Sequence, residues 1–314
     1  MRDKYVFGID IGGTSIKMGL FTTNGALTEK WEISTDIRNQ GESILTSIAQ
    51  SMMEHLKARK LSNDDVVGVG LGVPGAVRGE SFVAPCVNLN QWGNFDAAQS
   101  LEKLCGLPVK VVNDANAAAL GETWQGSAKG SLNIVFVTLG TGVGGGIVVD
   151  GKIISGTHGA GGEIGHIKVR EGESRTCGCG KHGCLEQYAS ATGLANEAAL
   201  VLAESNEPSI LRNHVSPGAK EVFRCATDGD KLAVKLVDNF ALQLGRALAS
   251  VSCICDPETI VLGGGVSAAG EPLLNAVRKA FLKHAFPSAE GTKFRLAKLG
   301  NDAGIYGAAR LLLI

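Results

Sequence analysis

Residues 5–21 read Y-V-F-G-I-D-I-G-G-T-S-I-K-M-G-L-F, and this stretch decides the fold. The apolar run at residues 5–10 closes on an acid and predicts a buried strand, and residues 16–21 predict a second strand. The Gly12-Gly13 pair between them permits a tight turn, because glycine adopts backbone angles that other residues avoid. Two strands joined by a short glycine turn are expected to begin an α/β unit.

The same turn also has the features of a phosphate site. Gly12 and Gly13 let the backbone approach a phosphate, their N–H groups form an anion-binding nest, and Thr14 adds a hydroxyl donor. Lys17 is a further candidate, and Asp10 could orient a magnesium ion through water. The alternative is an ordinary hairpin turn. The turn is neither a Walker loop nor a dinucleotide fingerprint, because a strand follows it rather than a helix.

A second glycine-rich turn, G-T-G-V-G-G-G at residues 140–146, repeats this design. It lies between predicted strands at residues 132–139 and 147–149. Its candidate nucleotide ligands are Thr141, Gly142, Gly144 and Gly145. Two such turns facing each other across a cleft would clamp a triphosphate. The two motifs together are a more specific sign of a nucleotide site than either motif alone. The repeat also predicts two similar α/β halves with a hinge near residues 113–132.

Hydrophobic periodicity indicates the remaining elements. An apolar stripe predicts helices at residues 42–60 and 231–255, and a shorter helix is expected at residues 115–122. Further strands are expected around Trp31 and Ile33 and at residues 66–73, 109–112 and 259–262. This order of strands and helices predicts a mixed α/β protein.

An Asn-Asp pair follows the strand predicted at residues 109–112. Because α/β sheets bind ligands at the carboxyl ends of their strands, Asp114 could accept the proton of an attacking hydroxyl while Asn113 bonds a neighbouring one. The competing interpretation is a helix N-cap, since Asp is favoured there and a helix follows. The two glycine-rich turns elsewhere in the chain favour the catalytic interpretation.

Residues 163–186 begin E-I-G-H and end C-G-C-G-K-H-G-C-L-E. Three thiolates and one imidazole make a closed tetrahedral zinc set. The predicted ligands are His166, Cys177, Cys179 and Cys184. His182 competes as the fourth ligand, but the spacing around His166 lets one ring nitrogen bind metal while the other meets a ligand oxygen. The metal does not need Glu163 or Glu186, so these carboxylates are candidates for binding a polyhydroxylated molecule.

Length and composition limit the functional class. A chain of 314 residues exceeds one hydrophobic core, so two domains are expected. A net charge of −1 without a basic stripe argues against nucleic acid or an anionic membrane as the partner. The uncharged residues 131–149 contain five glycines and predict two strands rather than a membrane span. Scattered cysteines and the lack of a secretory signal favour a reducing cytoplasm.

These motifs together resemble the ROK family of bacterial sugar kinases and related regulators. The resemblance covers D-I-G-G-T at residues 10–14, G-V-P-G at 72–75, N-D-A-N at 113–116 and the glycine turn from Gly140. It continues through G-A-G-G-E-I-G-H ending at His166, the cysteine motif ending at Glu186, G-G-G-V at 263–266 and N-D-A-G at 301–304. It therefore spans the whole chain.

The resemblance implies a fold and its domain boundaries. Members have the two-domain actin-like ATPase (ribonuclease H-like) α/β fold with an interdomain cleft. Here it implies an N-terminal domain at residues 1–113, completed by a C-terminal helix at about 302–314. The second domain would occupy residues 114–301 and carry the zinc-binding insertion at about 163–186.

The resemblance also implies ATP-dependent phosphorylation of the 6-hydroxyl of a hexose, with glucose favoured by the pattern around G-A-G-G-E-I-G-H. Asp114 would be the catalytic base. The implied sugar ligands are Asn88, Asn113, Asp114, Glu163, His166 and Glu186. Gly264, in G-G-G-V, would join the site for ATP and Mg²⁺, while Zn²⁺ would be structural. A homodimer or higher homo-oligomer is common in the family.

Several alternatives stay open at this point. N-acetylmannosamine, N-acetylglucosamine, fructose and allose are other acceptors, and polyphosphate is another donor. The family also contains sugar-responsive transcriptional regulators, which carry a helix-turn-helix region before the first D-x-G-G-T strand. Only nine residues precede Asp10 here, so an enzyme is expected. The intact Asp114 and both glycine turns argue against a noncatalytic sugar sensor.

Overall fold

The computed structural model describes residues 4–314, which divide into two compact units. The first unit runs to Leu132 and adds Gly146–Gly161 and Lys298–Ile314, and the second comprises Asn133–Gly145 and Gly162–Ala297. Residues 114–132 and 146–161 therefore group with the first unit, unlike in the predicted division at residue 113. The reason is close packing, because a Cβ on Gly146 would lie 2.7 Å from the Ala115 carbonyl oxygen.

The first unit is built on a five-stranded sheet with the order β3-β2-β1-β4-β8. Its strands are β1 (Tyr5–Ile11), β2 (Ser15–Thr22), β3 (Leu27–Ser34), β4 (Val66–Val73) and β8 (Val109–Asn113). β2 pairs antiparallel with both β1 and β3, whereas β4 runs parallel to β1 and β8. A small sheet of β5 (Val77–Arg78), β6 (Phe82–Val83) and β7 (Phe95–Asp96) accompanies it. The predicted hairpin and strands of this half are confirmed.

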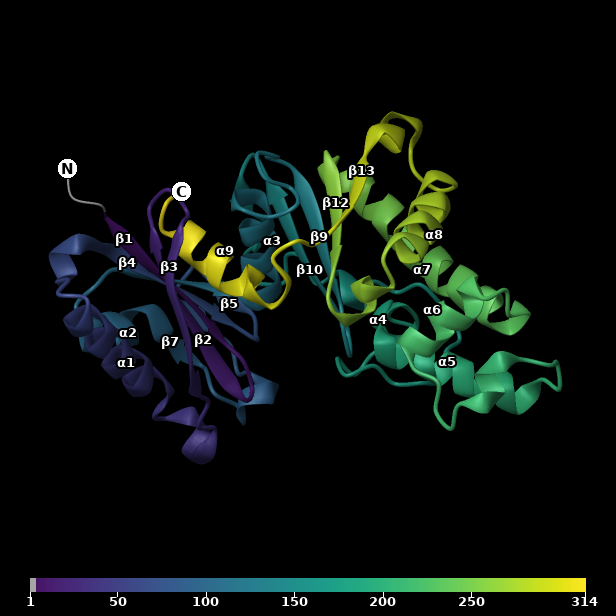
Figure 1. Ribbon diagram of the computed structural model, residues 1–314, viewed down its shortest axis with the longest axis horizontal. Coiled ribbons are helices and arrows are strands. Elements are labelled where there is room, and N and C mark those ends of the chain that lie inside the picture. The colour runs from purple at the N-terminus through teal and green to yellow at the C-terminus, as the bar shows by residue number, and fades with distance from the viewer. Residues whose placement is uncertain (1–3) are drawn as a thin grey trace. The chain divides into compact units, whose positions relative to one another are not determined.

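Helices pack against both faces of this sheet. They are α1 (Ile44–Ala58), α2 (Ala97–Cys105), α3 (Asp114–Trp124) and α9 (Ala303–Leu311). Successive side chains of a strand face opposite sides, so Phe7 belongs to the core that includes α1 and α2, and Val6 to the core that includes α9. α9 lies so close to β1 that a Cβ on Gly8 would collide with the Ile305 carbonyl. Figure 1 shows this last helix, in yellow, beside the strands of the first unit.

A buried carboxylate ties the returning chain to α3. Glu122 is fully buried, and its Oε1 accepts the backbone N–H groups of Lys298 and Leu299, each at 2.9 Å. Its Oε2 accepts the N–H of Ser127 at 2.6 Å. A buried carboxylate needs such donors, and these bonds hold the chain where it re-enters the first unit.

The sheet of the second half has the order β11-β10-β9-β12-β13. Its strands are β9 (Ile134–Leu139), β10 (Val143–Val149), β11 (Lys152–Ile153), β12 (Thr259–Gly263) and β13 (Lys293–Leu296). β12 runs parallel to both β9 and β13. β10 begins at Val143, so Gly144 and Gly145 lie in the strand and the turn is shorter than predicted.

Five helices complete the second unit, among them the predicted long helix at residues 231–255. They are α4 (Glu186–Ala189), α5 (Ala191–Glu204), α6 (Ala219–Thr227), α7 (Lys231–Cys255) and α8 (Glu271–Leu282). α7 begins where the Asp230 side chain accepts the Ala233 N–H at 2.9 Å, as an N-cap does. Phe240 of α7 packs edge-to-face on Phe223 of α6, with centroids 5.8 Å apart. The predicted long helix is therefore confirmed, and its buried side chains form part of this unit's core.

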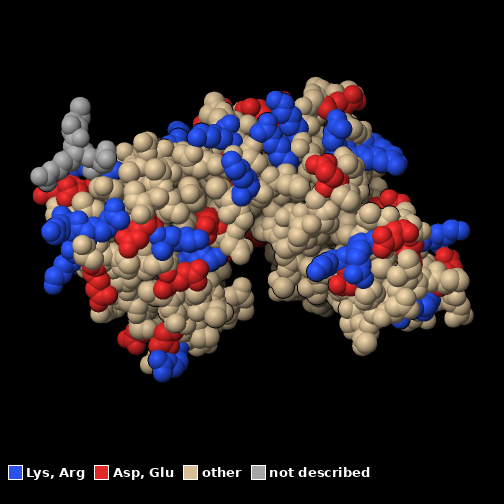
Figure 2. All heavy atoms as spheres, in the orientation of Figure 1, with Lys and Arg blue, Asp and Glu red and all other residues tan. Residues whose placement is uncertain are grey.

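Three further observations concern the helices, residues 131–149 and the charged surface. Within residues 4–314, none of the helices combines the length and apolar character needed to cross a bilayer. The uncharged residues 131–149 form β9 and β10, as predicted. On the face shown in Figure 2, lysine and arginine side chains are interspersed with aspartate and glutamate over both units.

Candidate active site

The turn between β1 and β2 presents two residues to solvent. Gly12 is held at its N–H, which donates to the Ser15 carbonyl at 3.0 Å. Thr35, just beyond β3, donates its hydroxyl to the Gly12 carbonyl at 2.7 Å and its N–H to the Thr14 carbonyl at 3.0 Å. Gly13 and Thr14 are exposed. Thr35, which the sequence did not single out, thus fixes a turn whose outer side is open to a ligand.

Asp10 is held at the end of β1 in an unusual electrostatic setting. It pairs across the sheet with Lys17, whose Nζ donates to the Asn301 carbonyl at 3.0 Å. Burial and the negative charge of Asp114 raise the pKa of Asp10 to about 6, and Lys17 partly opposes that rise. A Cβ on Gly304, the second residue of α9, would lie 2.6 Å from Asp10 Oδ2, so the first turn of α9 packs closely against this carboxylate.

Asn113, rather than Asp114, is the N-cap that the sequence left open as an alternative for Asp114. Asn113 is the N-cap of α3, since its Oδ1 accepts the N–H groups of Ala115 at 3.0 Å and Asn116 at 3.2 Å. Its Nδ2 donates to the Gly75 carbonyl at 3.2 Å. Asp114 is the first residue of α3, and its exposed carboxylate accepts the Ala115 N–H at 2.8 Å. Asp114 is therefore not the cap.

Asn88 lies in a short 3₁₀ turn, Val87–Leu89, and is exposed. Its carbonyl oxygen would be 3.4 Å from a Cβ on Gly13, which brings Asn88 beside the β1–β2 turn. The first unit thus contains one group of the predicted site residues. That group consists of Asp10, Gly12, Gly13, Thr14, Lys17, Asn88, Asn113 and Asp114.

The cysteine-rich segment of the second unit brings its four predicted metal ligands together. The donor atoms of His166, Cys177, Cys179 and Cys184 all lie within 4.8 Å of one another. Cys177 Sγ is 3.6 Å from His166 Nδ1, and Cys179 Sγ is 3.7 Å from Cys184 Sγ. Tetrahedral zinc with bonds of about 2.3 Å to sulfur and 2.0 Å to nitrogen would separate such atoms by about 3.5–3.8 Å.

The three thiols of this group must lose their protons to bind a metal, and their surroundings shift their pKa values in different directions. Burial raises the pKa of the Cys177 and Cys184 thiols, whereas a bond from the Lys181 backbone lowers the pKa of Cys179. A bound cation favours the thiolates and displaces their protons. His182 lies outside the group, with its Nδ1 3.1 Å from the Arg175 carbonyl.

The two predicted carboxylates flank the histidine. His166 Nε2 is 3.8 Å from Glu163 Oε2, and His166 Nδ1 is 3.8 Å from Glu186 Oε1. The thiol of Cys177 donates to Glu186 Oε1 at 2.7 Å. Because Nδ1 faces the thiols, Nε2 is the ring nitrogen that remains beside Glu163. The segment therefore sets an imidazole and two carboxylates side by side, as the sequence predicts.

The second glycine turn lies beside Glu186, one of the two carboxylates that flank His166. A Cβ on Gly142 would lie 2.7 Å from Glu186 Oε2. Thr141, Gly142, Cys177 and Glu186 line a pocket of about 390 Å³ within this unit. Gly264 has φ +79° and would place a Cβ 2.5 Å from the Leu139 N, so it packs where β9 enters the turn.

Gly144 and Gly145 were predicted to lie in the second glycine turn, but the structure places them in β10. Gly145 is buried, and a Cβ there would lie 2.5 Å from the Gly162 carbonyl and 2.6 Å from Ile164 Cγ1. Its missing side chain lets β10 pack against the segment that leads into His166. Residues 162–166 are placed by this contact.

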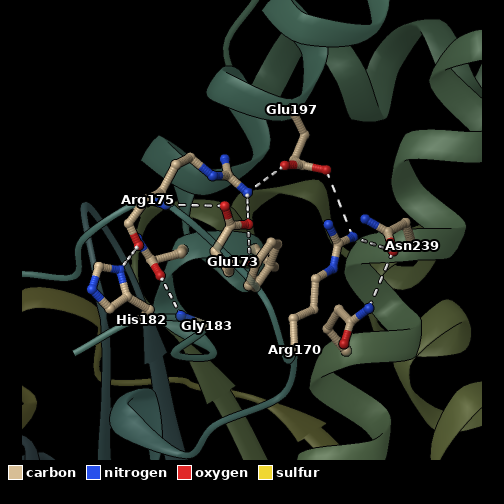
Figure 3. A network of polar contacts seen from close by, with 10 residues as sticks. Arg170, Glu173, Arg175, His182, Gly183, Glu197 and Asn239 are labelled. Carbon is tan, nitrogen blue, oxygen red and sulfur yellow. Dashed lines mark hydrogen bonds and ion pairs between the residues drawn. The ribbon is translucent and has the colours of Figure 1, made fainter.

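A charged network that the sequence did not reveal anchors the cysteine segment (Figure 3). Arg175 donates to Glu173 at 3.0 Å and to Glu197 of α5 at 2.8 Å. The buried Tyr188 hydroxyl also donates to Glu173. These hydrogen bonds, Arg175 first, lower the pKa of Glu173 to about 2. The network links the middle of the segment, at Glu173 and Arg175, to Tyr188 of α4 and Glu197 of α5.

Arg170 extends this network to α7. Its guanidinium donates to Asn239 at 3.2 Å, lies 3.8 Å from Glu197, and stacks 4.1 Å above the Tyr188 ring. The opposite charges of Arg170, Glu173 and Arg175 are visible in the sequence. Their partners on α5 and α7 are not, because only the fold brings those helices next to the segment.

Known proteins match the chain over almost its full length. The model of the ROK family matches residues 6–313. A glucokinase of Halalkalibacterium halodurans is 44% identical over an alignment that covers 99% of this chain and 96% of that protein.

Two solved structures are similar in fold as well as in sequence. A ROK hexokinase of Thermus thermophilus has a TM-score of 0.80 and 33% identity, with coverage of 97% of this chain and 96% of that one. A ROK family glucokinase of Streptomyces griseus, in complex with glucose and AMPPNP, has a TM-score of 0.73 and 32% identity, with coverage of 98% of both chains.

Proposed function

Because this chain belongs to the ROK family, we propose that it is a glucokinase, an enzyme that transfers the γ-phosphoryl group of ATP to the 6-hydroxyl of glucose. It has the two-domain actin-like ATPase fold of the ROK sugar kinases. The observation that carries the proposal is the exposed carboxylate of Asp114. It stands at the start of a helix capped by its neighbour, and its side chain is exposed.

Asp114 acts as the general base in this proposal. The 6-oxygen of glucose bonds to the γ-phosphorus, the bond from that phosphorus to the β,γ-bridging oxygen breaks, and ADP leaves. The hydroxyl proton passes to Asp114. Phosphoryl transfer depends mainly on position and charge, so a carboxylate held at a helix N-terminus fits the task. Asp10 stays close enough to interact with the charge of Asp114.

The sugar hydroxyls are assigned to residues of both units. Glu163, Glu186 and the Nε2 of His166 offer two acceptors and an imidazole side by side, which suits adjacent hydroxyls. Asn88 and Asn113 complete the assignment. Zn²⁺, held by His166, Cys177, Cys179 and Cys184, would be structural and would fix the orientation of the imidazole.

The nucleotide is assigned to the two glycine turns. Gly12, Gly13, Thr14 and Lys17 would bind phosphate oxygens from one turn, and Thr141 and Gly142 from the other, with Gly144, Gly145 and Gly264 shaping the second site. Asp10 is an oxygen donor of the type that Mg²⁺ takes. Mg²⁺ bound with ATP would neutralise charge on the phosphates.

We further propose a cytoplasmic location and a homo-oligomeric assembly. None of the eight cysteines is paired in a disulfide, and zinc-ligating thiolates are stable in a reducing compartment, where ATP is also available. The oligomer rests on the family resemblance alone and is tested by light scattering.

The test is a hexose panel with the zinc-loaded protein. Glucose, N-acetylglucosamine, N-acetylmannosamine, fructose and allose are each offered with ATP or polyphosphate, and products are identified by ³¹P NMR. We expect glucose 6-phosphate with ATP as the best pair. Higher kcat/KM for an N-acetylated hexose or for fructose would contradict the choice of sugar, and no transfer to any hexose would contradict the kinase.

A further inference from the structure

The three cysteines of the zinc-ligand group differ in their exposure to solvent. Cys177 and Cys184 are buried, whereas Cys179 is exposed. Glycines flank Cys179 on both sides, and a Cβ on Gly178 or Gly180 would meet no atom of residues 4–314 within 4 Å apart from its chain neighbours. Cys179 therefore lies in an open turn that a small reagent can reach and whose backbone has room to move.

A buried thiol lies close to this exposed one. Cys179 Sγ is 3.7 Å from Cys184 Sγ, and a disulfide needs about 2.05 Å. Cys184 is fixed by its bridge to Lys168, and the next residue, Leu185, donates its N–H to the Ile167 carbonyl at 2.8 Å. The two sulfur atoms thus need to approach by less than about 2 Å, and the glycine turn on the Cys179 side can supply the movement.

The other cysteines are placed differently. Cys253 is also exposed, but Cys255 stands only two positions further along α7, and side chains two apart on a helix do not face each other. Cys177 is buried, and its thiol contacts Glu186 Oε1 at 2.7 Å. The three remaining cysteines are all buried, namely Cys86, Cys105 and Cys225. Oxidation favours an exposed cysteine with a second thiol beside it, and Cys179 with Cys184 meets both conditions.

We propose that Cys179 is an oxidation site, at which a peroxide joins Cys179 and Cys184 in a disulfide and so releases the zinc ion. The Cys179 thiolate attacks one peroxide oxygen, the O–O bond breaks, and with one proton a sulfenic acid and water form. The Cys184 thiolate then attacks the Cys179 sulfur, the S–O bond breaks, and the leaving hydroxide takes up a proton. Two thiolates thereby lose two electrons, and hydrogen peroxide with two protons becomes two waters.

The disulfide removes two of the four proposed zinc ligands. His166 and Cys177 remain, which is too few for the closed four-ligand set that retains structural zinc. His166 lies 3.8 Å from both Glu163 and Glu186, so loss of the metal loosens the group assigned to sugar. This effect on glucose rests on the proposed function, whereas the disulfide and the zinc release do not. In a reducing cytoplasm such a disulfide is transient, as redox-sensing disulfides are.

The first test follows zinc and the disulfide together. The zinc-loaded full-length protein is treated with increasing hydrogen peroxide, zinc release is read with a chromogenic chelator, and disulfides are mapped by mass spectrometry without reduction. We expect one zinc ion released for each Cys179–Cys184 disulfide, and recovery of bound zinc after dithiothreitol and fresh zinc. Zinc release without this disulfide, the disulfide with zinc retained, or a protein that peroxide leaves unchanged would overturn the proposal. A reduced protein that binds no zinc would overturn it too.

The second test locates the first attack. Dimedone, which alkylates sulfenic acids, is added during a short exposure to peroxide, and Cys179 should be labelled before Cys177 or Cys184. Cys253→Ser is the matched control, since Cys253 is exposed but outside the ligand group, and this variant should release zinc at the wild-type rate. Earlier labelling of Cys177 or Cys184, or zinc retention in Cys253→Ser, would contradict the assignment.

Glucose titration separates the oxidation site from the kinase proposal. By isothermal titration calorimetry, the Kd for glucose should rise about tenfold after oxidation and return after reduction with zinc. An unchanged Kd in the oxidised, zinc-free protein would refute the link between the disulfide and the sugar. If glucose does not bind even the reduced protein, the proposed sugar site fails, while zinc release and the mapped disulfide still decide the oxidation site.

Discussion

The two groups of candidate site residues are held in place by different means. In the first unit, Asp10 closes a central strand, Asn113 ends another, and Asp114 begins a helix, so backbone hydrogen bonds of regular structure position them. In the second unit, residues 163–185 contain one 3₁₀ turn, Ile164–His166, and two isolated bridges, Lys168–Cys184 and Thr176–His182, and only Glu186 begins a regular element, the short helix α4. Their side chains depend on contacts outside the backbone ladder.

This difference separates the expected consequences of mutation. A side chain carried by a strand end or helix start keeps its position without further support, so replacing it should remove chemistry and leave the fold intact. An irregular segment has few backbone bonds to resist opening. The segment at residues 163–186 should therefore lose sugar affinity and local order whenever its metal ligands or its charged network are removed.

The largest expected effect is on turnover, through Asp114. Asp114→Asn should lower kcat by about 10²–10⁴-fold, because the variant cannot accept the hydroxyl proton. The substitution keeps the size of the side chain, so thermal unfolding should change little. A coupled assay of ADP release checks it. Turnover close to that of the wild type would remove Asp114 from the mechanism.

The second effect concerns the proposed zinc ligands of the segment at residues 163–186. Cys184→Ser should raise the glucose KM by about tenfold or more and reduce bound zinc, because three ligands no longer hold His166 in place. The matched control is Cys253→Ser, an exposed cysteine outside the ligand group. Zinc content and KM are measured on both proteins. If zinc-free Cys184→Ser kept the wild-type KM, the segment would not need its metal.

The third effect concerns Asp10, whose ionised carboxylate is expected to lower the free energy of unfolding while supporting turnover. Its folded pKa of about 6 exceeds the ordinary 3.8, so the folded state binds the proton more tightly than the unfolded state. The stabilising contribution is present below pH 3.8 and is lost as pH rises to about 6. Asp10→Asn should therefore raise the free energy of unfolding at pH 7 by about 1–3 kcal/mol while lowering turnover.

Urea denaturation at several pH values checks this expectation. The gain from Asp10→Asn should shrink as the pH falls from 6 towards 4. Asp238→Asn, an exposed change on α7, is the control. If the free energies of unfolding of wild type and Asp10→Asn differed by the same amount at every pH, ionisation of Asp10 would not destabilise the folded protein.

The smallest effect concerns the charged network. Arg175→Met should lower the free energy of unfolding by about 1 kcal/mol and raise the glucose KM a few-fold, with kcat kept, because Glu173 and Glu197 lose their shared donor. Arg38→Met removes an exposed arginine whose partner Asp36 is two residues away, and should change neither quantity. A loss of kcat without a change in KM would place Arg175 in the chemistry instead.

The elements and the metal-ligand group that depend on short local sequence patterns were predicted correctly. The β1–β2 hairpin, β4, α7 and the four-member thiol–imidazole group all follow from local patterns of a few residue types. The extent of the second glycine turn did not, since Gly144 and Gly145 are in β10 because of contacts with residues 162–164. Glu122 and Glu197 were also missed, because their partners come from distant parts of the chain.

The most direct test is the affinity of the Asp114→Asn protein for glucose, measured by isothermal titration calorimetry in the presence of zinc. The account predicts a Kd within about threefold of the wild-type value, because the asparagine oxygen can still accept a hydrogen bond from the 6-hydroxyl, whereas only a carboxylate can take its proton. A Kd that rises by the same factor as turnover falls would contradict it, because the loss of turnover would then come from lost sugar binding rather than from a lost base.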